Sequence, residues 1–169
     1  MKCLLSMLVA CAILTPAVSA DEKAQMAIHY FVGAWSGDLG GAEYYAKART
    51  TKDGKSVLEK GATLAADGGW CFKTYVLWEP GDRPGTVVMY YYNGNGAHFR
   101  TDTVLSRKGE FFELKGKQTG IYGGGEREMA DCVLVVSDKD HYTLKFTNRT
   151  VEGEDRPDQV YKFTRQLSE

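Results

Sequence analysis

The sequence predicts an all-β fold: a single antiparallel up-and-down barrel of about eight to ten strands, preceded by a short helix. Short segments in which apolar and polar residues alternate recur along the chain, separated by turns rich in Gly, Asn, Asp and Pro. After residue 32 no helix of crossover length separates these segments, so parallel β-α-β units are not expected. Closing such a meander into a barrel removes its unpaired edges.

The first 20 residues predict a secretory signal peptide. Lys2 gives a positive start, "CLLSMLVACAIL" is an apolar core, and "AVSA" ends in small residues before Asp21. We therefore expect cleavage after Ala20, export to the periplasm or outside the cell, and one domain over residues 21–169. An alternative is a membrane-anchored lipoprotein cut before Cys11, because "LVAC" resembles a lipobox. The apolar stretch before Cys11 is short for a lipoprotein signal, and apolar residues continue after Cys11 where a polar tether would be expected. Both features favour the signal peptide.

Charge and hydropathy argue against a nucleic-acid partner and against a membrane span. Removing Lys2 with the signal reduces the 21 Lys and Arg residues by one, against 22 Asp and Glu, so the net charge is near −2. These charges are interspersed, which is not the electrostatic footprint of a nucleic-acid-binding protein. After the signal, no run of about 18 apolar residues predicts a membrane span.

The predicted elements follow in order. Residues 21–32 are the helical candidate, because Ala24, Ala27, Ile28 and Phe31 recur at helical spacing before Gly33. About nine strands follow, with turns such as "KDGK", "PGDRPG" and "NGNG" between them. Their ranges are 42–51, 56–65, 70–79, 86–92, 97–106, 111–119, 127–137, 141–150 and 160–167.

Two motifs give the chain a family resemblance. "YFVGAWSGD" places Gly33 and Trp35 between the helix and the first strand, and "TNRTVEGEDRPD" runs from Thr147 to Asp158 before the last strand. In this order they resemble exported bacterial lipocalin-like (calycin) domains of uncharacterised function. The resemblance implies a calycin barrel whose closed end is plugged by Trp35.

The second motif carries four residues for which we expect structural roles. Asn148 or, in its place, Thr150 can bond to turn backbone, Gly153 can take a positive φ, and Pro157 precedes the last strand. Arg149 can hold several acceptors with its five donors, either as a structural clamp or as a ligand contact.

Aromatic strand residues predict a ligand pocket in the barrel. A barrel of this size either fills itself with side chains or holds one small ligand, and Tyr combines an apolar body with a polar tip. We expect the interior ligand-binding residues to be Tyr75, Tyr90, Tyr92, His98, Arg100 and Arg149. The alternative is that the aromatic residues simply form the core.

The sequence predicts no metal, cofactor or catalytic site. His29, His98 and His141 are scattered, and "GIYGGGE" lacks the following helix that would help to bind phosphate. Some calycin barrels bind haem through a His on the last strand, which is absent here; His98 or Tyr161 are the remaining candidates for that ligand.

Two cysteines, Cys71 and Cys132, remain after the signal. They form one disulfide if they face each other from neighbouring strands, and are separate core residues if their strands are distant. The second arrangement is slightly favoured.

The function that we expect is therefore an exported, non-enzymatic domain that binds a small apolar or amphipathic molecule. The alternatives are a structural or protein-interaction barrel with a self-filled core, and an enzyme with an unrecognised site.

Overall fold

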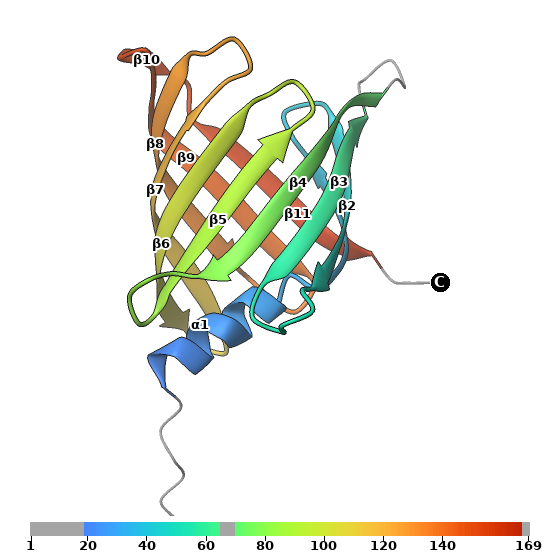
Figure 1. Ribbon diagram of the computed structural model, residues 1–169, viewed down its shortest axis with the longest axis vertical. Coiled ribbons are helices and arrows are strands. Elements are labelled where there is room, and N and C mark those ends of the chain that lie inside the picture. Colours follow the sequence, from blue (N-terminus) through green and yellow to red (C-terminus); the bar gives the residue numbers. More distant parts are fainter. Residues whose placement is uncertain (1–18, 65–69, 167–169) are drawn as a thin grey trace, which may run out of the picture.

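The computed structural model describes residues 19–64 and 70–166, which form a closed antiparallel β-barrel with one helix across an end (Figure 1). This arrangement confirms the predicted fold class. In chain order the elements are α1 (Ala20–His29), β1 (Gly33–Asp38), β2 (Glu43–Thr50), β3 (Val57–Leu64), β4 (Trp70–Pro80), β5 (Thr86–Asn93), β6 (His98–Lys108), β7 (Phe111–Ile121), β8 (Arg127–Val136), β9 (His141–Val151), β10 (Glu154–Arg156) and β11 (Gln159–Gln166).

The barrel wall has ten strands. Strands β1 to β9 follow one another, each paired with the next, and β11 closes the gap by pairing with both β9 and β1. Strand β10 is a short addition beside the end of β9. The sequence prediction omitted β1 and β10 as separate strands because neither is long enough to show a clear alternation.

Helix α1 differs from the predicted range of 21–32 at both ends. It begins at Ala20 because Ser19 and Glu22 form a reciprocal capping box. It ends at His29, after which the backbone NH groups of residues 30–32 bond three residues back rather than four, which tightens the chain into a final turn. The helix lies across the bottom of the barrel in Figure 1.

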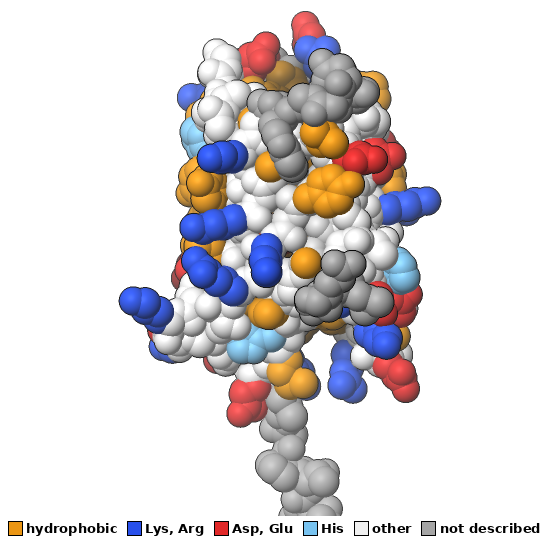
Figure 2. All heavy atoms as spheres, turned by 90° about the vertical axis from the view of Figure 1, so that its right-hand side faces the viewer, with side chains coloured by type: hydrophobic (Ala, Val, Ile, Leu, Met, Phe, Trp, Pro, Cys, Tyr) orange, Lys and Arg blue, Asp and Glu red, His pale blue; other side chains and the backbone are white. Residues whose placement is uncertain are grey.

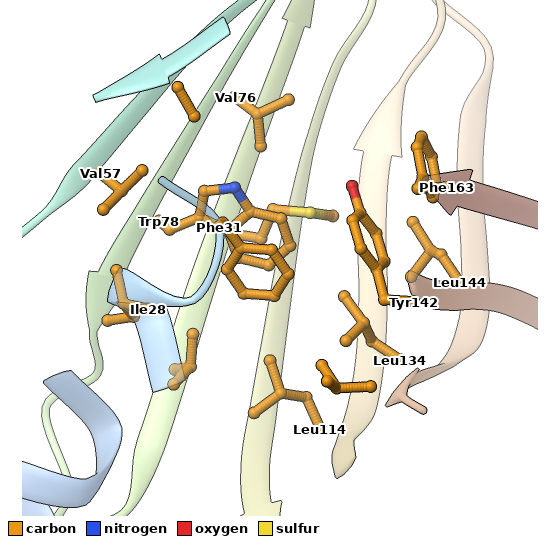
Figure 3. Close-up of a cluster of buried hydrophobic side chains, with 14 of the residues drawn as sticks. Ile28, Phe31, Val57, Val76, Trp78, Leu114, Leu134, Tyr142, Leu144 and Phe163 are labelled. Carbon is orange, nitrogen blue, oxygen red and sulfur yellow. The ribbon is translucent and has the colours of Figure 1, made fainter. Parts of the chain in front are cut away.

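The half of the barrel next to α1 is filled by its own side chains. Phe31 stacks on Trp78 with 4.1 Å between ring centroids, and Ile28, Leu114 and Leu134 belong to the same buried cluster (Figure 3). The expected self-filled core therefore describes this half of the interior.

Trp35 lies at the same closed end and is 1% exposed. The guanidinium of Arg165, on β11, lies 4.3 Å from the centre of the Trp35 ring and donates to the carbonyls of Tyr30 and Val32 at 2.8 and 2.5 Å. Gly33 has a φ of 130°, and a Cβ there would lie 2.6 Å from an Arg165 nitrogen. Glycine is therefore favoured where β1 starts, because this φ strains any residue that has a side chain.

The outer surface in Figure 2 carries separate hydrophobic patches among Lys and Arg side chains. Within residues 19–64 and 70–166, no helix is long and apolar enough to cross a membrane.

The two remaining cysteines lie on strands that are not neighbours. Cys71 is in β4, which pairs with β3 and β5, whereas Cys132 is in β8, which pairs with β7 and β9. Cys132 is a free, buried cysteine, and burial raises the pKa of its thiol to about 12. The strand order therefore favours two separate cysteines over a disulfide between neighbouring strands.

Candidate functional site

A cavity of about 370 Å³ occupies the half of the barrel opposite α1. This volume is at the lower end of the range of about 300–1,000 Å³ that is typical of small-molecule sites. Apolar and aromatic side chains dominate its lining, with a few polar groups among them. The lining residues are Leu39, Ala42, Tyr44, Glu59, Thr63, Phe72, Val76, Trp78, Met89, Tyr91, Asn93, Asn95, Ala97, Phe99, Gln118, Tyr122, Glu128, Tyr142, Leu144, Phe146, Gln159, Tyr161 and Phe163.

The floor of the cavity is the upper surface of the filled half. Figure 3 shows the indole nitrogen of Trp78 and the hydroxyl of Tyr142 on the same side of the buried cluster, away from Leu114 and Leu134. Trp78 and Tyr142 line the cavity, whereas the two leucines do not. The two aromatic residues thus present their polar atoms toward the hollow half.

A buried carboxyl group lies in the cavity wall. Glu59, on β3, is 3% exposed and accepts a hydrogen bond of 2.5 Å from the Tyr44 hydroxyl of β2. The Thr74 hydroxyl of β4 donates to the same tyrosine oxygen at 3.2 Å. These three strands are neighbours, and each residue faces the interior at its register position, so the pleat brings the three side chains together.

Burial raises the pKa of Glu59 to about 7, although the hydrogen bond from Tyr44 opposes this by favouring the ionised form. Burial and the neighbouring carboxyl also raise the pKa of Tyr44 far above its ordinary value, so that its hydroxyl remains a donor. Glu59 therefore changes its charge near neutral pH while the tyrosine does not.

Three buried polar atoms around the cavity have no hydrogen-bond partner among the described residues: Oε2 of Glu59, Oγ1 of Thr63 and Nε1 of Trp78. The Trp78 indole favours the ionised form of Glu59, but its Nε1 lies outside hydrogen-bond geometry with the carboxylate. Unsatisfied buried polar groups are costly, so a bound molecule that satisfied them would be stabilised.

A second polar cluster centres on Arg149, which is 6% exposed. Its guanidinium donates to Glu128 at 2.7 Å, to the carbonyl of Pro157 at 2.7 Å and to the Tyr122 hydroxyl at 3.0 Å. These partners come from β8, from the connection before β11 and from the β7–β8 turn. Glu128 and Tyr122 line the cavity, whereas Arg149 does not; its three bonds join three segments of the chain.

A β-bulge explains how Arg149 reaches the interior. Asn148 and Arg149 both lie opposite the single residue Ala130 of β8, and Asn148 takes a φ of 49°. The Asn148 amide donates to the Asp131 carboxylate at 2.8 Å, and not to turn backbone as the sequence predicted. The extra residue shifts the alternation of β9, so that the interior side chains change from even positions such as Phe146 to odd ones such as Arg149.

The rest of the "TNRTVEGEDRPD" motif forms the edge beside this bulge. Glu152 and Gly153 have positive φ values of 51° and 82° and connect β9 to β10 in a two-residue turn. Pro157 and Asp158 then separate β10 from β11, and the carbonyl of Pro157 is the one that Arg149 binds.

Five of the expected interior residues lie on the outer face of the barrel. Tyr75 pairs with Tyr92, Tyr92 with His98, and Tyr90 with Arg100, so the structure brings these side chains together. Tyr75 and Tyr92 are 43% and 48% exposed, and none of the five lines the cavity. Their predicted interior placement is therefore wrong.

The prediction failed on which face of the strands these residues occupy, although the structure does place them near one another. Strand β5 reads "VVMYYY", which is apolar on both faces, so alternation alone does not identify the inner one. In the folded barrel Met89 and Tyr91 face the cavity, and Tyr90 and Tyr92 face outward. On the outer face Arg100 instead pairs with Asp102 at 2.7 Å.

Sequence reasoning missed Glu59 and Arg165. Glu59 shares its alternation with Val57 and Thr63, which is a weak signal for an inward carboxyl because the opposite face, with Leu58 and Leu64, is equally apolar. Arg165 binds backbone carbonyls at the closed end of the barrel, a role that the sequence suggested for Arg149.

The three histidines are exposed and separate from the cavity, with partners Gly54 for His29, Gly96 for His98 and Asp138 for His141. Among the described residues, no group of three or more His, Cys, Asp or Glu side chains is placed to hold a metal ion.

The barrel fold is shared with one solved structure at a TM-score above 0.5. The crystal structure of Rv2717c from M. tuberculosis is similar with a TM-score of 0.62 and 16% identity, covering 85% of this chain and 98% of that one. A de novo designed fluorescence-activating β-barrel is similar with a TM-score of 0.45 and 14% identity, covering 83% of this chain and 97% of that one. No family model and no curated protein matches the sequence.

Proposed function

We propose that residues 21–169 form an exported, non-enzymatic binding domain that holds a small apolar or amphipathic molecule in the barrel cavity. The observation that carries this proposal is the cavity of about 370 Å³, lined mainly by apolar and aromatic side chains. Well-packed interiors leave few voids larger than a water molecule. A hollow of this size therefore represents lost packing that a bound molecule would restore.

The polar groups of the lining favour an amphipathic ligand over a purely apolar one. Glu59, Thr63 and Trp78 each keep a buried polar atom without a partner among the described residues. A molecule with one polar end and an apolar body would fill the hollow and satisfy some of these atoms, as in typical ligand sites.

Export is supported by the order of Lys2, the apolar core and "AVSA", although residues 1–18 lie outside the described part of the chain. Cleavage after Ala20 would remove the N-cap Ser19, which costs a helix about 1 kcal/mol. Helix α1 would still be held by Ala24, Ala27 and Ile28, which are buried against the barrel.

The test uses a neutral apolar dye, N-phenyl-1-naphthylamine, whose fluorescence rises on transfer to an apolar site. We expect saturable binding to the mature protein and loss of binding in an Ala42→Trp variant, because Ala42 lines the cavity next to β2. The matched control is Ala62→Trp, at an outward position of β3 opposite the exposed Tyr45. Equal dye binding by both variants would place the dye outside the cavity.

A native mass spectrum of protein purified from its own host tests occupancy directly. A reproducible extra mass that disappears on denaturation supports a bound ligand. A clean apo mass in repeated preparations, together with no dye binding, would favour the structural or interaction barrel.

A further inference from the structure

The cavity contains a carboxyl group that no cation pairs among the described residues. Two carboxyl side chains, Glu59 and Glu128, line it, and no Lys, Arg or His is among the described lining residues. Glu128 is paired with Arg149 at 2.7 Å. Glu59 has only the Tyr44 hydroxyl as a hydrogen-bond partner among the described residues, and its second oxygen is unpaired there.

A buried carboxylate without a cation is unfavourable, because it has lost its hydration without gaining an opposite charge. Residues that carry such a group in a core are expected to be paired or to be neutral. When Glu59 is ionised, its pairing group has to come from outside the described part of the protein, and a ligand that enters the cavity is the simplest source.

Aromatic rings surround the same position. The Tyr44 ring packs edge-on against Phe163, with 6.0 Å between centroids, and Phe163 stacks on Tyr142 at 4.5 Å. Trp78 completes the wall on β4. The faces of Trp and Tyr rings attract cations, so an aromatic lining is compatible with a cationic ligand.

From this arrangement we propose that the ligand carries a positively charged amine on an apolar body, and that Glu59 is the carboxylate that binds the amine. This inference rests on the binding function proposed above and adds the chemical class of the ligand. An ammonium group donates up to three hydrogen bonds. One would reach the free oxygen of Glu59, and the Thr63 hydroxyl offers a second acceptor on the same face of β3.

The competing chemistries fit less well. A neutral alcohol would satisfy the free oxygen without balancing its charge. A carboxylate ligand would place two negative groups together unless they shared a proton. The experiment below therefore includes an alcohol and a carboxylate as competing ligands.

The experiment measures displacement of N-phenyl-1-naphthylamine by n-octylamine, 1-octanol and octanoate, which share one chain and differ in the polar end. At about pH 8 we expect octylamine to bind about tenfold or more tightly than octanol, because bonds between charged groups contribute more than neutral ones. Octanoate should be the weakest. Octanol binding equal to or tighter than octylamine binding, or a preference for octanoate, would overturn the proposal.

The Glu59→Gln variant assigns the preference to this residue. It retains an acceptor for Tyr44 and removes the charge, so the advantage of octylamine over octanol should disappear. Glu43→Gln, an exposed carboxylate on β2, is the matched control and should keep the advantage. An amine preference that persists in Glu59→Gln would contradict the assignment.

A pH titration of the unaltered protein gives a second measurement that needs no variant. The ionisable groups that face Glu59 are Tyr44 on β2 and Tyr142 on β9, and both stay protonated because burial raises their pKa values. The amine preference should therefore rise between about pH 5.5 and 8 as Glu59 loses its proton, since octylamine stays charged throughout. A flat preference would overturn the proposal.

Failure of the underlying binding function gives a different result. In that case neither the dye nor octanol binds, whatever the pH, and the cationic-ligand proposal falls with it.

Discussion

Replacing Arg149 with Lys should destabilise the protein although the charge is unchanged. The planar guanidinium of Arg149 reaches Glu128, the carbonyl of Pro157 and the Tyr122 hydroxyl at once, each within 3.0 Å. A lysine ammonium is a single point that keeps the ion pair with Glu128 but does not span the other two acceptors.

The magnitude follows from the two lost hydrogen bonds. Each bond from a charged donor contributes about 1.5–3 kcal/mol, and water admitted near the mouth of the barrel recovers part of the loss. We therefore expect the free energy of unfolding to fall by about 2–4 kcal/mol. Removing the cation entirely, in Arg149→Met, should cost about 3–5 kcal/mol because Glu128, which is 2% exposed, would be left as an unpaired buried charge.

Urea unfolding followed by tryptophan fluorescence measures these changes as a shift of the midpoint at constant slope. The matched control is Arg156→Lys on the adjacent strand β10, where the side chain is 46% exposed and its contact with Glu154 is 3.5 Å long. That variant should stay within about 0.5 kcal/mol of the parent. An Arg149→Lys protein as stable as the parent would refute the clamp, and if it also lost dye binding, Arg149 would be a ligand contact.

The remaining predictions concern four other features. Trp35→Ala should lower the free energy of unfolding by about 3–5 kcal/mol, because the side chain is buried; an unchanged urea midpoint would contradict this. Since burial raises the folded-state pKa of Glu59 to about 7 from 4.5, the contribution of Glu59 to the free energy of unfolding should be fully present below about pH 4.5 and should fall by about 3 kcal/mol as pH rises to about 7. Glu59→Gln should lack this fall, and equal pH dependence of the two proteins would show that another group causes it. Thiol counting on the denatured, unreduced mature protein should find two thiols, from Cys71 and Cys132, whereas none would reveal a disulfide. Mass analysis of exported protein should show a chain that begins at Asp21, and a lipid-modified N-terminal cysteine would show an anchored lipoprotein instead.

The sequence by itself determined the fold class and most strand positions. The strand over residues 141–150 shows why: Tyr142, Leu144 and Phe146 alternate with polar residues, and this period identifies a strand with one buried face. Turns such as "NGNG" are equally local, because Gly and Asn take the required conformations without help from distant residues. Barrel closure was predicted as a means of protecting the edges, and the pairing of β11 with β1 provides it.

Only the tertiary structure decided which faces line the cavity. Tyr90 and Tyr91 are adjacent and chemically identical, yet one faces solvent and the other the cavity, because the inner face of β5 is fixed by its register with β4 and β6. A shift of one residue in the register of a strand moves every side chain to the opposite face. A bulge has the same effect on the residues that follow it, and the bulge at Asn148 is what turns Arg149 to the interior. The burial of the Glu59 carboxyl depends on the same long-range pairing, which no local pattern of apolar and polar residues specifies.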